Sequence, residues 1–206
     1  MSFDVDVRHR FRSGTVAALA FESGAGLTAL FGPSGVGKSS ALAMIAGLLR
    51  PDAGHVRVAG RTLFDHTSNV PAEHRRSGYI FQDARLFPHY RVRANLLYGA
   101  ARAAGAGMTL DEVSALLGIA HLLDRWPRTL SGGEAQRVAI GRALLSGPAF
   151  LLMDEPLASL DRVRRGEIME LIERVRDEVG LPILYVSHDR GEVDRLATTV
   201  VEMGAG

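Results

Sequence analysis

The chain has 206 residues, of which 47% are hydrophobic and 23% charged, and its formal net charge is +1. This composition is ordinary for a globular protein of one domain, and the balanced charge argues against a general nucleic-acid-binding surface. The absence of cysteine excludes disulfide bonds and thiolate metal sites, and the longest apolar runs are far shorter than the roughly 20 residues of a membrane-spanning helix.

The first part of the chain predicts short strands around one helix. Four segments have the apolar character of short strands: residues 27–31, 55–58, 61–64 and 79–81. Residues 39–50 have the pattern of a helix, which Pro51 and Gly54 are expected to end. A turn is expected at residues 59–60, and the polar residues 65–77 are expected to form a loop.

The middle of the chain, residues 90–145, predicts helices and no strand. Two capping boxes, in which Ser or Thr is followed three residues later by Glu, precede apolar runs here: Thr109 with Glu112, and Ser131 with Glu134. We therefore expect a helical subdomain over about residues 83–145.

The last part of the chain returns to strands that alternate with helices. Three apolar runs predict strands: residues 150–153, 183–186 and 199–203. Residues 162–179 predict an amphipathic helix that Gly180 closes, and residues 190–197 predict a short helix. Apolar strands alternating with helices indicate an α/β fold with a mostly parallel sheet covered on both faces.

The loop after the first apolar strand carries the most specific motif. Residues 32–39 read Gly-x-x-x-x-Gly-Lys-Ser, a P-loop pattern whose backbone N–H groups cradle phosphates. Lys38, the one lysine of the chain, would reach the β- and γ-phosphates, and the Ser39 hydroxyl can bind Mg²⁺. The alternative is an ordinary glycine-rich turn. We expect a nucleoside triphosphate to be held by Gly32, Pro33, Ser34, Gly35, Val36, Gly37, Lys38, Ser39 and Ser40.

Other predicted strands also end in polar side chains. Asp154 and Glu155 follow residues 150–153, and His188 follows residues 183–186. Because ligands of open α/β sheets lie beyond the carboxyl ends of the strands, we expect these side chains at one rim. Asp154 would hold Mg²⁺ and Glu155 would activate the attacking water. The alternatives are an acidic strand exit and an ordinary core or surface histidine.

Residues 130–134, Leu-Ser-Gly-Gly-Glu, form a second unusual feature. Ser131, Gly132 and Gly133 open a predicted helix with bare backbone N–H groups and a hydroxyl, which together suit an anion. The alternative is an ordinary capped helix start.

The motifs together resemble the ATP-binding subunits of ABC transporters over essentially the whole chain. They occur in the family's order: the Walker A loop (32–39), the Q-loop Gln82, the signature (130–134), the Walker B end (151–155), the D-loop (159–161) and the switch histidine His188. The resemblance implies a P-loop NTPase core over residues 1–82 and 146–206, the helical subdomain, and a small N-terminal antiparallel β portion.

The resemblance also implies a mechanism in which two copies pair head to tail and hydrolyse ATP. The γ-phosphate would meet Lys38, Gln82 and His188 of one copy and residues 131–133 of the other. The implied catalytic residues are Glu155, His188 and Lys38, and the implied Mg²⁺ residues are Ser39, Gln82 and Asp154. Members of the family stack adenine on an upstream aromatic ring, for which Phe11 is the candidate.

Within the family, residues 81–99, 138–145 and 154–161 resemble the corresponding segments of molybdate importers. The ATPase subunits of those importers often continue into a small β-rich regulatory domain, which is absent up to Gly206. Sulfate, ferric iron and polyamine importers have similar segments. The implied partners are transmembrane permease subunits, signalled through Gln82 and residues 86–88, and indirectly a periplasmic or extracellular solute-binding protein. The chain would then lie peripherally on the cytoplasmic face of the inner membrane, without a nucleic-acid partner.

Two other functions remain open. A soluble ABC ATPase acting on DNA would carry a long coiled coil between Q-loop and signature, whereas Gln82 and Ser131 are 49 positions apart (131 − 82), and one acting on ribosomes would carry two sets of motifs. A domain that binds but does not hydrolyse ATP is disfavoured by the presence of Glu155 and His188.

Some residues are expected to be structural. The arginine pairs at 75–76 and 164–165 are expected at the solvated surface. The apolar residues of the segment after Gln82 are expected in the subdomain core, although an exposed subset could receive a partner helix: Phe87, Tyr90, Leu96, Leu97 and Tyr98.

Overall fold

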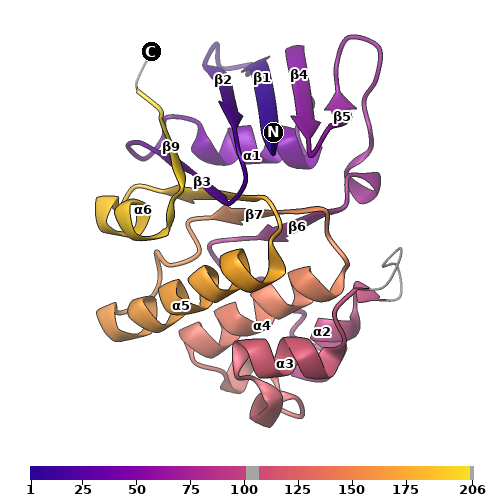
Figure 1. The fold of residues 1–206 in the computed structure, drawn as a ribbon, viewed down its shortest axis with the longest axis vertical. Helices are drawn as coiled ribbons and strands as arrows, with labels where there is room; N and C mark the ends of the chain where they lie inside the picture. The colour runs from indigo at the N-terminus through magenta and orange to yellow at the C-terminus, as the bar shows by residue number, and fades with distance from the viewer. Residues whose placement is uncertain (101–106, 205–206) are drawn as a thin grey trace.

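The computed structural model describes residues 1–100 and 107–204. These residues form two sheets, with helices between the sheets and on the other face of the central sheet (Figure 1). The central sheet has the order β6-β7-β8-β3-β9, and all its neighbouring strands are parallel. Its strands are β3 (Leu27–Phe31), β6 (Ser77–Ile80), β7 (Phe150–Asp154), β8 (Ile183–Ser187) and β9 (Thr199–Glu202).

The second sheet is antiparallel and formed mainly by the N-terminal part of the chain, with the order β2-β1-β4-β5. Its strands are β1 (Phe3–Arg10), β2 (Val16–Ser23), β4 (Ala53–Val58) and β5 (Arg61–Phe64). The predicted α/β class and its N-terminal antiparallel portion are both confirmed.

The helices cover both faces of the central sheet. They are α1 (Lys38–Ala46), α2 (Val92–Leu97), α3 (Leu110–Leu117), α4 (Gly132–Leu145), α5 (Arg162–Arg174) and α6 (Arg190–Leu196). Helix α1 lies between the two sheets, whereas α4 and α5 lie on the opposite face of the central sheet, with α2 and α3 beyond α4 (Figure 1). Among the described residues, no helix is long and apolar enough to span a bilayer.

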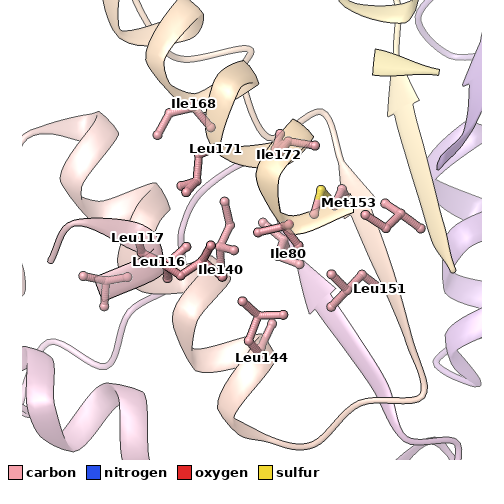
Figure 2. Close-up of a cluster of buried hydrophobic side chains, with 14 of the residues drawn as sticks. Ile80, Leu116, Leu117, Ile140, Leu144, Leu151, Met153, Ile168, Leu171 and Ile172 are labelled. Atoms are coloured by element: carbon pink, nitrogen blue, oxygen red, sulfur yellow. The ribbon is translucent and has the colours of Figure 1, made fainter. Parts of the chain in front are cut away.

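Successive side chains of β7 enter two different apolar clusters, one on each face of the central sheet. Leu151 and Met153 belong to the apolar cluster under α4 and α5, in which Leu144 and Ile168 also lie (Figure 2). Leu152, one residue out of phase, belongs to the cluster between the two sheets. Successive residues of a strand point to opposite faces, so a continuous apolar strand needs cover on both sides.

The helices differ from the sequence prediction at two places. Helix α1 ends at Ala46 rather than near residue 50, because Gly47 adopts a left-handed conformation (φ 81°) and its N–H closes the last turn. The expected helical stretch is interrupted, since only 3-10 turns join α3 to α4, and its residues 101–106 lie outside the described part of the chain. Both predicted capping boxes, at Thr109 and Ser131, are confirmed.

Arg75, expected at the solvated surface, is buried at 1% exposure, which corrects that prediction, whereas Arg76 is exposed. The Arg75 guanidinium donates hydrogen bonds to the carbonyl oxygens of Met44 and Ile45 (both 2.9 Å) and of Val70 (2.8 Å). The last carbonyls of a helix lack intrahelical partners and favour a cation. Arg75 therefore joins the segment after β5 to the end of α1.

We predict that Arg75→Ala lowers the free energy of unfolding by about 3 kcal/mol, because several buried carbonyl groups lose their donor. Urea denaturation measures this change. Arg76→Ala is the matched control and should cost less than about 1 kcal/mol, since Arg76 is exposed. Equal losses in the two variants would show that Arg75 contributes no more than a surface arginine.

Candidate nucleotide-binding site

Strand order brings the sequence motifs to one edge of the central sheet. Strands β7, β8 and β3 are adjacent and parallel, with Asp154 in register with Val186 and Phe31 with Ser187. The loops that follow these strands carry the P-loop, Glu155 and His188. These motifs therefore lie beside one another, as the sequence predicts.

Lys38 is held inside the curl of the P-loop. Its Nζ donates hydrogen bonds to the carbonyl oxygens of Gly32 (2.7 Å) and Pro33 (2.9 Å), and its exposed fraction is 4%. The same Nζ lies 3.7 Å from Oε1 of Glu155. An ammonium has three N–H donors, so the two carbonyls leave one donor for a further acceptor. Gly32 admits no side chain, because a Cβ there would lie 2.3 Å from the carbonyl oxygen of Met203.

Asp154 is hydrogen-bonded on both carboxylate oxygens. Ser39 donates its hydroxyl to Oδ1 (2.9 Å), and Tyr79 donates its hydroxyl to Oδ2 (3.3 Å). Burial raises the pKa of Asp154, although both hydroxyl donors oppose the rise. Burial also raises the pKa of Tyr79, so its O–H remains a donor. Tyr79 was not predicted; its position in the strand before Gln82 was the only sequence signal.

The hydroxyl of Ser39 and the carboxylate of Asp154 suit Mg²⁺, which prefers hard oxygen ligands and often has only one or two protein ligands. Within the described residues, no three His, Cys, Asp or Glu side chains are grouped to hold a metal ion. This donor set fits an ion that is otherwise coordinated by phosphate and water oxygens.

Glu155 turns sharply out of β7. Its backbone has φ 45°, a left-handed conformation that is uncommon outside glycine, and its N–H donates to the carbonyl oxygen of Val186 (3.1 Å). The side chain is thereby directed toward Lys38 and His188, whose Nδ1 lies 3.0 Å from Glu155 Oε2. Unusual backbone conformations of this kind cluster at functional sites.

A cavity of about 460 Å³ opens over these groups. Its lining consists of Ser34, Gly35, Gly37, Lys38, Ser39, Ser40, Gln82 and Glu155. Gln82, which follows β6, is thus brought to the P-loop. A second cavity of about 790 Å³ shares Ser34 and Gly35 and continues along β2. Phe11 lines neither cavity; its partly buried ring packs edge-on against His9, with ring centres 4.7 Å apart.

The start of α4 does not line the P-loop cavity. Ser131 accepts a hydrogen bond from the N–H of Glu134 (3.3 Å), whose carboxylate accepts one from the N–H of Ser131 (2.7 Å). A Cβ on Gly133 would lie 3.7 Å from the Arg164 side chain, so this helix start adjoins the first turn of α5. Gly132 is exposed. Within the described part of the chain, none of residues 130–134 lines the P-loop cavity.

The segment after Gln82 corrects a further prediction, because only Leu96 of its five apolar residues is fully buried. Tyr90 and Tyr98 are 37% and 51% exposed, and the Phe87 ring contacts both, with ring centres 5.8 Å and 4.3 Å away. Asn95 is fully buried and holds this loop, since it donates to the carbonyl of Tyr90 (2.9 Å) and accepts from the N–H of Phe87 (2.8 Å). The aromatic cluster Phe87, Tyr90 and Tyr98 therefore has a fixed shape at the surface.

Fold and site define a nucleotide-binding domain of the P-loop class. Residues 16–158 match the family model described as ABC transporter, and the chain belongs to the ABC transporter family, as its motifs predicted. The chain is similar to the molybdenum import ATP-binding protein ModC of Brucella abortus, with 59% identity over 203 residues that cover 96% of this chain and 56% of that protein.

Other relatives agree. The ModC protein of Mesorhizobium japonicum is 55% identical over 210 residues that cover 100% of this chain and 56% of that protein. The chain thus spans just over half the length of the curated relatives it matches. Among solved structures, cbiO1 from Clostridium perfringens, part of the ABC transporter complex cbiONQ, matches with a TM-score of 0.84 and 28% identity, covering 100% of this chain and 86% of that one.

We predict that Asp154→Asn raises the free energy of unfolding of the nucleotide-free protein at pH 7 by about 1 kcal/mol, a common gain at functional sites. The amide keeps the hydroxyl contacts and removes a charge that burial disfavours. Because the pKa of Asp154 is raised in the folded state, its penalty exists above the pKa of the unfolded chain and disappears below it. The advantage of the variant should therefore vanish near pH 3.

The control for this prediction is Asp161→Asn at the start of α5. Asp161 is exposed, and the backbone N–H of Arg164 lowers its pKa, so its charged form is favoured in the folded state. Asp161→Asn should therefore be slightly less stable than the wild type. Thermal unfolding at pH 3 and pH 7 measures both variants, and a destabilised Asp154→Asn at pH 7 would contradict the prediction.

Proposed function

We propose that this chain is the ATP-binding and ATP-hydrolysing subunit of an ABC importer for a small oxyanion, molybdate. One observation carries the ATPase proposal. Lys38 and Glu155 lie in contact at the cavity over the P-loop, beside the Ser39–Asp154 pair, and His188 contacts Glu155.

In this proposal the phosphates of ATP lie in the P-loop, in contact with its N–H groups and with the third donor of Lys38. Glu155 takes a proton from a water whose oxygen attacks the γ-phosphorus, and the bond to the bridging oxygen breaks to give ADP and phosphate. His188 holds the Glu155 carboxylate through Nδ1 and leaves Nε2 for the γ-phosphate. A Mg²⁺ ion bound by Ser39 and Asp154, with Gln82 nearby, would neutralise phosphate charge.

We further propose that a second copy of the chain completes the site. The helix start at Ser131, Gly132 and Gly133, of which Gly132 is exposed, carries N–H groups and a hydroxyl that suit an anion, yet it is absent from the lining of its own P-loop cavity. A head-to-tail pair would place it over the partner's γ-phosphate.

The aromatic cluster Phe87, Tyr90 and Tyr98 is the proposed contact with a transmembrane permease subunit, which in turn would receive solute from a solute-binding protein. Exposed aromatic rings on a rigid loop suit the apolar side of a partner helix. The loop follows Gln82 directly, so closure at the γ-phosphate would move it. In this proposal the chain would lie peripherally on the cytoplasmic face of the inner membrane.

The proposal of molybdate rests on the relatives, which are 55–59% identical and are named molybdenum import proteins. The site itself binds nucleotide, so it carries no information on the solute. Sulfate, ferric iron and polyamines remain the alternative solutes of the same proposal.

We predict that Glu155→Gln lowers the rate of ATP hydrolysis at least about 100-fold, the scale of a lost general base. ATP binding should persist, and an ATP-bound dimer should accumulate. Phosphate release and light scattering after size exclusion with ATP measure the two effects. Glu73→Gln, at an exposed position, is the control and should behave as the wild type. Normal turnover in Glu155→Gln would remove Glu155 as the base.

The solute is tested in the assembled transporter. We predict that the chain, reconstituted in vesicles with the permease and binding protein with which it co-purifies, hydrolyses ATP several-fold faster with molybdate. Sulfate, ferric iron and spermidine serve as comparison solutes in the same assay. Stimulation by one of these and not by molybdate would overturn the solute assignment and leave the ATPase assignment intact.

A further inference from the structure

Glu192 is a buried carboxylate that the proposed reaction does not use. It lies in α6 and is 5% exposed. One of its oxygens, Oε2, accepts hydrogen bonds from the hydroxyls of Tyr185 and Ser187, each at 2.7 Å. Its other oxygen, Oε1, lies 3.7 Å from Nε of Arg165 in α5.

These contacts fix both chain neighbours of His188. Ser187 donates its hydroxyl to Glu192 and accepts the N–H of Asp189 on the same oxygen (3.0 Å). Asp189 Oδ1 caps α6 by accepting the N–H of Gly191 (2.8 Å), and its Oδ2 accepts from Arg165 (2.9 Å). The backbone on either side of His188 is thus tied to one carboxylate and one guanidinium.

The same groups surround the contact between His188 and Glu155. A cavity of about 50 Å³ is enclosed by Glu155, His188, Arg165, Asp189 and Glu192, together with neighbouring residues. Arg165 and Glu192 therefore face the same small space as the imidazole.

Stability alone does not account for a carboxylate at this place. Removing a carboxylate from water costs several kcal/mol, and buried ion pairs often add no net stability over apolar side chains. Burial, followed by the neighbouring Glu192, raises the pKa of Tyr185, so the Tyr185 hydroxyl keeps its proton and donates it to Glu192. What the carboxylate supplies is a single acceptor that both hydroxyl donors share.

We propose that Glu192 is a positioning residue for His188, acting through Ser187 and, with Arg165, through Asp189. The inference rests on the proposed ATPase, since it assigns His188 a place beside the γ-phosphate. Arg165 extends the link to the first turn of α5, which adjoins Gly133 of the signature. The orientation of His188 is thereby tied to the helix turn that bears on the neighbouring nucleotide site.

A matched pair of substitutions separates positioning from stability. Ser187→Ala and Tyr185→Phe each delete one 2.7 Å hydrogen bond to the same oxygen of Glu192, but only Ser187 adjoins His188. We predict that Ser187→Ala and Glu192→Gln lower kcat for ATP hydrolysis about 10-fold, with KM for ATP within about 2-fold, as expected for a misplaced catalytic group. Tyr185→Phe should keep kcat within about 2-fold of the wild type.

A second measurement does not depend on turnover. The His188 ring signals in the NMR spectrum, assigned with His188→Ala, should shift in Ser187→Ala and Glu192→Gln and stay unchanged in Tyr185→Phe. Equal effects of Ser187→Ala and Tyr185→Phe on kcat and on the ring signals would overturn the positioning role. A wild-type chain without ATPase activity would overturn the proposed function instead, while the ring signals would still decide the positioning.

Discussion

The site depends on the parallel pairing of β7 and β3 with β8, which lies between them. Parallel neighbours end at the same edge, so three short apolar strands deliver their following loops to one place. The register, with Asp154 opposite Val186, sets the depth of each loop. Apolar clusters on both faces hold the strands, and helix α1 lies between the sheets with its first residue, Lys38, at the P-loop. The packing of apolar side chains therefore determines where the charged side chains of the site lie.

Those charges are placed at a cost to the folded state. Burial raises the pKa of Asp154, and Glu155 occupies a backbone conformation that few residues other than glycine adopt. Lys38 balances the negative charge of the site only in part, since its Nζ is 3.7 Å from Glu155 and two of its three N–H donors are engaged by carbonyl groups. A triphosphate and a divalent cation would balance such a set of charged donors and acceptors, so the cost falls where the ligand binds.

The sequence predicted the features that depend on residues adjacent in the chain, such as strands and loops. The apolar runs at 150–153 and 183–186 predicted β7 and β8 to within one residue, and the glycine-rich loop lines the cavity that is the proposed phosphate site. Contacts between distant segments were not predictable from pattern. Arg75 is buried because its guanidinium reaches carbonyls about 30 positions earlier, whereas Arg76 beside it stays exposed. Tyr79 joins the site only because β6 pairs in register with β7.

Helix α5 contacts both parts of the chain that would bind ATP in the proposed pair, the signature and the segment around His188. Its first turn adjoins the signature through Arg164 and Gly133, and its next residue, Arg165, binds Asp189 beside His188. In a head-to-tail pair, the signature bears on the partner's nucleotide and His188 on the chain's own. One helix turn would then contact both sites. A displacement of this turn on closure over one nucleotide would then reach the surroundings of the other, and the two ATP molecules are expected to act together rather than independently.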